Sequence, residues 1–207
     1  MDHFEYRNGE LYAEDVSLRQ IADEVGSPVY VYSVATLERH YQAFADGVSG
    51  LNPLVCFAVK ANSNIAVIKT LARLGAGADV VSVGELKRAM AAGVPASKII
   101  YSGVGKSEVD LRAALNAGVH QINAESEAEL ELLSKVASDL GETAQVAIRI
   151  NPNVDAKTHE KITTGKSENK FGVDIALARD VYGRVSKLPG LRVAGVALHI
   201  GSQLTDL

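Results

Sequence analysis

The chain has 207 residues, of which 47% are hydrophobic and 22% charged, so it has enough apolar material for a folded core and is not typical of a disordered protein. Its 21 basic and 25 acidic residues give a formal charge of −4 without long runs of one sign, which argues against a nucleic-acid or anionic-membrane partner and favours a small molecule. The single cysteine, Cys56, excludes an internal disulfide framework, and no apolar run approaches the length of a membrane span, so we expect a cytoplasmic protein.

Short apolar runs alternate with longer helical patterns from residue 54 onward. The runs are apolar on nearly every residue, as parallel strands covered on both faces are, and the alternation predicts repeated βα units. Serine followed three residues later by Glu or Gln predicts three helix starts, at Ser17, Ser82 and Ser126. The predicted strands are 54–59, 79–82, 98–102, 120–123, 145–150 and 192–200, and the predicted helices lie near 64–74, 84–92, 107–117, 127–140 and 174–187.

Six successive units favour a (β/α)8 TIM-like barrel over an open sheet. Because such a barrel needs eight strands and about 250 residues, we expect about six βα units of an incomplete barrel in this chain. The polar segment 151–172 is long for a loop in a compact domain, and it is a candidate lid or interface loop.

Polar side chains close most of the predicted strands, and in a barrel the loops after the strands build the active site at one rim. Lys60, Arg149 and His199 end the first, fifth and sixth strands, where small turn residues are more usual. Each of them alone could instead form an ordinary surface or structural contact. The other polar residues expected at this rim are Asp79, Ser82, Glu85, Ser102, Asn123, Glu125 and Ser202.

Lys60 is the most informative of these residues because it directly follows six apolar residues. A partly desolvated lysine has a lowered pKa, and its neutral amine is a nucleophile toward carbonyl groups. The pattern leaves two chemistries open: direct reaction with a carbonyl substrate, as in aldolases, and covalent attachment of pyridoxal phosphate. No other ligand motif is complete, since GVGKS (103–107) and TGKS (164–167) lack the first glycine of a phosphate loop and the histidines lack zinc-site spacing.

Five motifs in one order resemble the pyridoxal-phosphate-dependent decarboxylases built on an alanine-racemase-like barrel. They are CFAVKANSN, GAGADVVSVGEL, IRINPN, THEKITTGKSENKFG and VALHIGSQ, and the resemblance runs from about residue 25 to the last residue. The H-x-K-I-x-T-G segment (159–165) and the HIGSQ ending are most similar to the diaminopimelate decarboxylases. The resemblance implies decarboxylation of meso-2,6-diaminopimelate to L-lysine and carbon dioxide, the last step of lysine biosynthesis.

The resemblance also implies roles for single residues. Lys60 would bind the cofactor covalently, His199 would lie on the face of its pyridine ring, and Ser202 would donate to its phosphate. Lys170 matches a position at the dimer interface, because these enzymes share active sites across a homodimer. Charge and hydrogen-bond support around the cofactor is expected from Asp79, Glu85 and Arg149.

The resemblance further implies parts outside this chain, namely a glycine-rich phosphate loop and a C-terminal β domain that reads the distal end of the substrate. We interpret PVYVYS (28–33) as a strand that joins that domain. The domain boundaries are therefore an N-terminal segment, 1–30, and a partial cofactor-binding barrel, 31–207. We expect this N-terminal portion to be inactive on its own.

Other functions stay open at this stage. An ornithine- or arginine-type decarboxylase would share the lysine and the K-F-G and H-x-G-S elements. A racemase on the same barrel would place a tyrosine shortly after Lys60, where Asn62, Ser63 and Asn64 stand. A non-catalytic homologue would be expected to have lost cofactor residues, and an aldolase would need no cofactor.

Overall fold

The computed structural model describes residues 2–154 and 171–202. The chain begins with a three-stranded antiparallel sheet of β1 (Phe4–Arg7), β2 (Glu10–Ala13) and β3 (Val16–Ser17), followed by α1 (Leu18–Val25). These strands were not predicted, because they have only two to four residues each and carry no apolar run. The predicted start of α1 is confirmed, since Ser17 Oγ accepts the N–H of Gln20 at 3.2 Å.

Residues 28–33 form no strand among the described residues. The domain that this strand was expected to join was placed outside this chain, so the interpretation of 28–33 as a joining strand stays a prediction. These residues run as an extended connection from α1 to α2 (Val34–Gly47), and Tyr30 is 88% exposed. In the part of the chain that the structure describes, this segment pairs with no strand. Ser33 is buried at its end, where its Oγ accepts the N–H of Thr36 at 3.0 Å and caps α2.

The main sheet contains the six predicted strands, all parallel and in sequence order. A short strand, β9 (Val173–Asp174), pairs with the end of β8 and was not predicted. The strands are β4 (Cys56–Ala58), β5 (Gly77–Val80), β6 (Ile99–Tyr101), β7 (Gln121–Ala124), β8 (Ala144–Asn151) and β10 (Leu191–Ala197).

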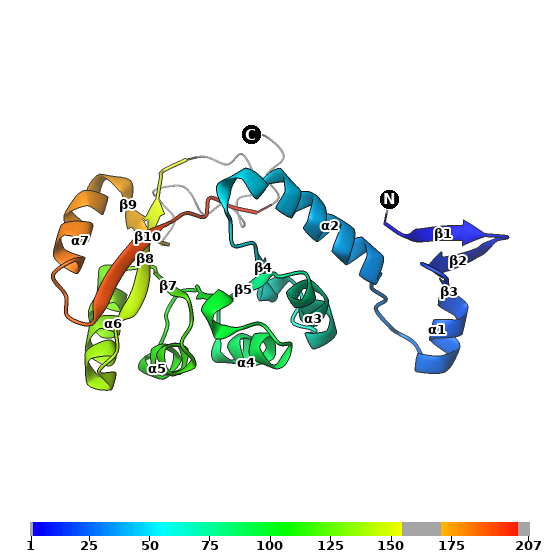
Figure 1. Ribbon diagram of the computed structural model, residues 1–207, viewed down its shortest axis with the longest axis horizontal. Helices are drawn as coiled ribbons and strands as arrows, with labels where there is room; N and C mark the ends of the chain where they lie inside the picture. The colour runs from blue at the N-terminus through cyan, green and yellow to red at the C-terminus, as the bar shows by residue number, and fades with distance from the viewer. Residues whose placement is uncertain (1, 155–170, 203–207) are drawn as a thin grey trace.

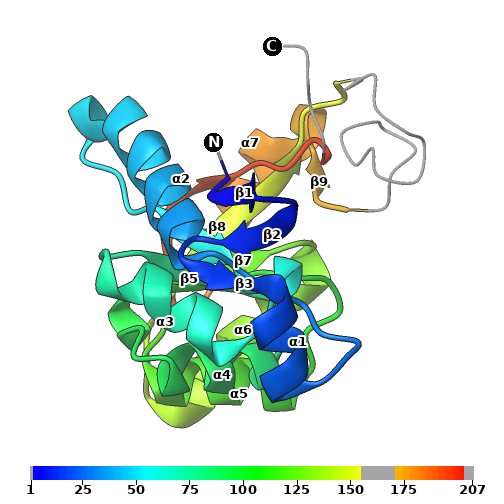
Figure 2. The same cartoon turned by 90° about the vertical axis from the view of Figure 1, so that its right-hand side faces the viewer.

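Five helices follow these strands and confirm the predicted βα alternation. Figures 1 and 2 show α3 to α6 together along one side of the strands, while β1 to β3 and α1 stand at the other end of α2. No helix among the described residues is long and apolar enough to cross a membrane. The helices are α3 (Ile65–Arg73), α4 (Val83–Ala91), α5 (Glu108–Ala117), α6 (Glu127–Leu140) and α7 (Ala178–Val185).

The core lies between the strands and these helices. Strands β5 and β8 bury residues of both faces, which explains why their sequences are apolar almost throughout. Each fully buried aliphatic side chain contributes about 1.5–3 kcal/mol relative to an exposed one. Large side chains that are almost fully buried include Ile99, Ile122, Ile148, Leu111, Leu130 and Leu133.

Several element boundaries differ from the prediction, among them the end of β10, which lies at Ala197 and not at residue 200. β5 begins at Gly77, two residues earlier than expected. A Cβ at this position would lie 2.3 Å from the Lys98 carbonyl oxygen, so only glycine lets β5 pass this close to the residue before β6. The last predicted helix begins at Ala178 after a short 3-10 helix, Ile175–Leu177. Most of the candidate lid, together with Lys170, lies outside the described residues.

Candidate active site

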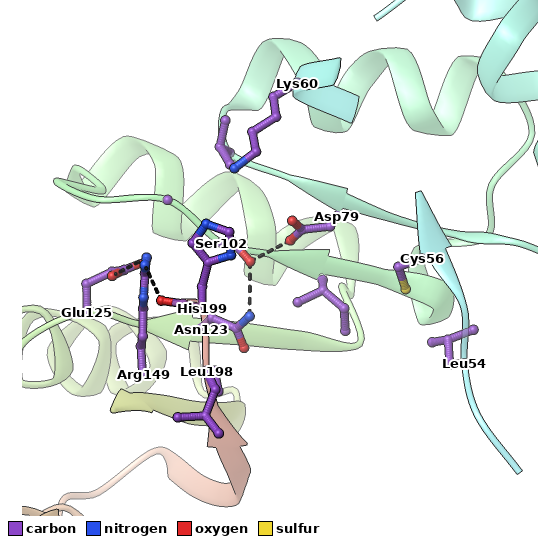
Figure 3. A pocket seen from close by; sticks show the side chains of 14 residues that line it. Leu54, Cys56, Lys60, Asp79, Ser102, Asn123, Glu125, Arg149, Leu198 and His199 are labelled. Atoms are coloured by element: carbon purple, nitrogen blue, oxygen red, sulfur yellow. Dashed lines mark hydrogen bonds and ion pairs between the residues drawn. The ribbon is translucent and has the colours of Figure 1, made fainter. Parts of the chain in front are cut away.

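The carboxyl ends of the parallel strands surround a cavity of about 360 Å³ (Figure 3). Four predicted site residues line it: Lys60 follows β4, Asp79 lies in β5, Arg149 lies in β8, and His199 follows β10. Residues separated by up to 139 positions therefore meet at one site, as the carboxyl edge of a parallel sheet requires. The polar groups Ser102, Asn123 and Glu125 complete this edge, and they also follow or end strands.

Lys60 lies in a 3-10 helix, Val59–Ala61, that directly continues β4. Val59 is fully buried and anchors this turn, and the Lys60 side chain points toward the cavity in Figure 3. Lys60 itself is exposed, which differs from the partial desolvation that we expected. The reason is that β4 is an edge strand of the described sheet, so no neighbouring strand covers its outer side there.

Asp79 is the last acceptor in a chain of hydrogen bonds across three strands. Gln121 Nε2 donates to Asn123 Oδ1 at 2.8 Å, and Asn123 Nδ2 donates to Ser102 Oγ at 3.0 Å. Ser102 Oγ then donates to Asp79 Oδ1. Burial raises the pKa of Asp79 above its usual value, while the Ser102 hydrogen bond and the charges of Lys60 and His199 oppose this shift. Asp79 is thus a desolvated carboxyl group facing two basic side chains.

Arg149 and Glu125 form a largely buried ion pair at the ends of β8 and β7. Arg149 Nη1 donates to both Glu125 oxygens, at 3.0 and 2.9 Å, and the two side chains are only 13% and 6% exposed. The guanidinium carbon also lies 5.7 Å from the centre of the Phe171 ring. Arg149 Nη2 donates to the His199 carbonyl oxygen at 3.5 Å, so Arg149 connects β8 to the segment after β10.

His199 contributes a largely uncharged ring. Partial burial lowers the pKa of His199 below its usual value of 6.5, and the positive charges of Arg149 and Lys60 lower it further. The neutral imidazole therefore predominates at neutral pH. A flat, uncharged ring at a cavity wall can stack on an aromatic ligand.

The remaining predicted residues lie away from the cavity wall. Glu85 is not among the lining residues: its Oε2 accepts the N–H of Val81 at 2.9 Å, just before the N-cap of α4 at Ser82. Ser202 is exposed at the end of the described chain and does not line the cavity. The position of Lys170 is outside the described residues. Their proposed contacts with a cofactor stay predictions.

The apolar residues and the glycine that line the cavity were missed from the sequence, and two of them belong to the apolar run before Lys60. Leu54 and Cys56 both face the cavity, and their spacing of two residues is the period with which a strand presents side chains on one face. Burial, and then the negative charge of Asp79, raises the pKa of Cys56 to about 11, so its thiol stays protonated at neutral pH. Applying the strand period to this run would have found both residues.

The side chains around the cavity fit pyridoxal phosphate. A primary amine, from Lys60, is the group that can bind the cofactor aldehyde, and the neutral imidazole of His199 can lie against its ring. The cavity volume also falls in the range of small-molecule sites, about 300–1,000 Å³. In the described chain no group of three His, Cys, Asp or Glu side chains is placed to bind a metal ion.

Comparison with known proteins gives the same family along the whole chain. Diaminopimelate decarboxylase of Pseudomonas aeruginosa is 56% identical over 207 residues, and that of Vibrio cholerae is 53% identical over 208 residues. Each alignment covers 100% of this chain and 50% of the relative. The chain therefore spans about half the length of the curated relatives it matches.

Solved structures of this family share the fold. Diaminopimelate decarboxylase from M. jannaschii in co-complex with L-lysine has a TM-score of 0.90 and 38% identity, over 98% of this chain and 49% of that one. Lysine decarboxylase from Selenomonas ruminantium has a TM-score of 0.79 and 26% identity, over 94% of this chain and 48% of that one. Residues 34–207 match the family described as pyridoxal-dependent decarboxylase, pyridoxal binding domain. The chain thus belongs to the pyridoxal-dependent decarboxylases, whose pyridoxal-binding domain it contains.

Proposed function

We propose that the protein of which these residues form the pyridoxal-binding domain decarboxylates meso-2,6-diaminopimelate to L-lysine and carbon dioxide. The identity of 56% to the Pseudomonas aeruginosa diaminopimelate decarboxylase supports this substrate over ornithine or arginine. The observation that carries the proposal is the Lys60 amine at a cavity that also contains Asp79, His199 and the Arg149–Glu125 pair. The activity is attributed to the whole protein, since the chain spans about half of its relatives.

Each residue at the cavity has a distinct task in this proposal. Lys60 attaches the cofactor covalently through its ε-amine, and the Asp79 carboxylate attracts the Lys60 ammonium and so orients the amine. His199 supplies a neutral ring that fixes the plane of the cofactor. When bound, pyridoxal phosphate supplies the electron sink that accepts the electron pair left by loss of carbon dioxide.

The Arg149–Glu125 pair has a geometric task. Because the two charges neutralise each other, the pair adds a fixed dipole without adding net charge to the cavity. Its two hydrogen bonds hold the ends of β7 and β8 at a set distance and fix the orientation of the Arg149 guanidinium group.

Three further residues have proposed roles outside the cavity wall. We assign to Ser202 a hydrogen bond to the cofactor phosphate, to Glu85 indirect support through Val81, and to Lys170 a place at a homodimer interface.

Borohydride reduction of the protein in the presence of pyridoxal phosphate, followed by peptide mass analysis, tests the site. We expect the label on Lys60, and Lys60→Ala should lose the label and nearly all activity while unfolding as the wild type does, because its exposed side chain adds little packing. A label on Lys69, Lys87 or Lys106 would contradict the assignment.

The substrate is tested by comparing the release of carbon dioxide from meso-diaminopimelate, L-ornithine, L-arginine and L-lysine. Faster turnover of L-ornithine, L-arginine or L-lysine than of meso-diaminopimelate would contradict the proposed substrate.

A further inference from the structure

A second ion pair lies behind the cavity, and no step described so far uses it. Lys106 and Glu129 are buried, with side chains 1% and 7% exposed, and Lys106 Nζ donates to Glu129 Oε1 at 2.5 Å. Nζ also donates to the carbonyl oxygens of Gly103, at 2.6 Å, and Asn123, at 2.7 Å. Three N–H bonds of one ammonium group thus meet three acceptors, which leaves none for a ligand.

The acceptors of this pair are backbone atoms of residues that line the cavity. Lys106 holds the carbonyls of Gly103 and Asn123, while the other Glu129 oxygen accepts the N–H of Glu125 at 3.5 Å. All three held residues line the cavity. The pair therefore joins the loop after β6, the end of β7 and the first turn of α6 at one point.

Two of the three held residues, Asn123 and Glu125, bind the polar side chains of the cavity. Asn123 donates to Ser102, which donates to Asp79, and Glu125 pairs with Arg149. Gly103 has a backbone φ of +94° that side-chain-bearing residues rarely adopt, and a Cβ there would lie 3.0–3.3 Å from Val81 atoms, so this position requires glycine and the loop packs closely against Val81. A shift of the backbone at these points would reorient both Asp79 and Arg149.

A buried ion pair is a costly way to obtain stability alone. Burial raises the pKa of Glu129, and the Lys106 ammonium opposes this shift. Replacement of such a pair by apolar side chains of similar volume is often neutral or stabilising, whereas removal of one partner is strongly destabilising. Apart from the bond within the pair, the side-chain hydrogen bonds of Lys106 and Glu129 end on backbone atoms of cavity residues, which is better explained by the geometry that the pair fixes.

We propose that Lys106 and Glu129 are positioning residues for the cofactor site, which hold the ends of β6 and β7 so that Asp79 and Arg149 face the cavity. This inference rests on the proposed function only in taking pyridoxal phosphate as the ligand. It assigns a role to the lysine of GVGKS, a segment that fails as a phosphate loop.

The test separates positioning from stability with the double variant Lys106→Met, Glu129→Leu, made in the protein at its natural full length. The dissociation constant for pyridoxal phosphate is measured from the visible absorbance of the bound cofactor, and stability from thermal unfolding of the cofactor-free protein. We expect a melting temperature close to that of the wild type and a dissociation constant at least tenfold higher. Wild-type affinity in the folded double variant would overturn the inference and leave the proposed function standing.

A second comparison applies if the double variant fails to fold. Glu129→Gln keeps the shape of the side chain and removes its charge, and Val136→Ala, a fully buried position of the same helix away from the cavity, is the matched control. At equal loss of stability, we expect Glu129→Gln to weaken cofactor binding several-fold more than Val136→Ala does. Equal affinities in the two variants would overturn the inference, and a wild-type protein that binds no pyridoxal phosphate would overturn the proposed function as well.

Discussion

At the scale of single residues, Asp79 combines two opposing influences. Burial favours its neutral form, whereas the Ser102 hydroxyl donates to it and Lys60 and His199 place positive charge near it. The hydrogen bonds from Gln121 through Asn123 and Ser102 all run toward this carboxylate, so its acceptor role is fixed by neighbours on the next two strands, β6 and β7. A carboxyl group placed where burial makes its charge costly, beside two basic side chains, indicates a chemical rather than a packing role.

Asp79→Asn tests this balance through the pH dependence of stability. Because burial holds the pKa of Asp79 above its usual 3.8, the folded state keeps this proton longer than the unfolded state does. The contribution of Asp79 is thus favourable at low pH and is lost as the pH rises from about 3.8 through the folded pKa. We expect Asp79→Asn to unfold at higher denaturant concentration than the wild type at pH 7, with the difference shrinking toward acid, and to lose turnover. A larger advantage of the variant in acid would contradict the direction of the shift.

His199→Ala tests the ring at the cavity wall. If the neutral imidazole lies on the cofactor, its removal should raise the dissociation constant for pyridoxal phosphate and slow turnover together, each by about tenfold, the worth of an aromatic contact of about 1.4 kcal/mol. Covalent attachment at Lys60 should persist. His199→Phe, which keeps a flat ring, is the control and should restore most of the cofactor affinity. If His199→Ala binds and turns over as the wild type does, His199 is an ordinary residue of the strand end.

At the scale of elements, the strands that are buried in the main sheet were the ones that the sequence predicted correctly. Strands β5 and β8 bury most of their residues and β6 and β7 bury alternate residues, so their apolar positions and the polar residues after them could be read directly. Strands β1 to β3 have only two to four residues each and carry no apolar run, so the local sequence did not reveal them, whereas the interpretation of 28–33 as a joining strand stays a prediction. Lys60, Asp79, Arg149 and His199 could be placed at one edge because parallel strands bring their carboxyl ends together. The role of Lys106 could not, since its partners are backbone carbonyls up to 17 residues away and a carboxylate 23 residues away.

Gly77→Ala tests the close approach of β4, β5 and β6. A Cβ at this position would lie 2.3 Å from the Lys98 carbonyl oxygen and 2.7 Å from Cys56 Sγ, and the backbone oxygen cannot rotate away. We expect a loss of unfolding free energy of about 1–3 kcal/mol, typical of an overpacked core, measured by urea denaturation. Gly195→Ala in β10 is the matched control, because nothing lies within 4 Å of its added Cβ. Equal stability of the two variants would show that β5 adjusts without strain.

At the scale of the whole molecule, the sheet and the N-terminal strands are joined through α2. Glu14 Oε1 accepts the Ser33 hydroxyl at 2.8 Å and the Ala35 N–H at 3.0 Å, which ties β2 to the start of that helix. The main sheet ends at β4 on one side and at β10 on the other, and neither outer edge has a partner strand among the described residues. Apolar side chains are exposed along the β10 edge, where Val196 is 59% and Leu198 61% exposed. Unpaired backbone groups beside exposed apolar side chains favour association between chains.

The behaviour of residues 1–207 expressed alone tests this view of the two edges. We expect these residues to self-associate in sedimentation velocity, to bind pyridoxal phosphate weakly, and to release no carbon dioxide from meso-diaminopimelate, with the Pseudomonas aeruginosa relative as the positive control. Val196→Lys places a charge on the exposed edge and should reduce self-association at least several-fold, since a charged side chain on an edge strand opposes pairing. Leu198→Ala lies just past β10 and removes apolar surface without adding charge, so it should reduce association less. A monomer that turns over at a rate near that of the relative would mean that neither edge needs to be covered for folding or for catalysis.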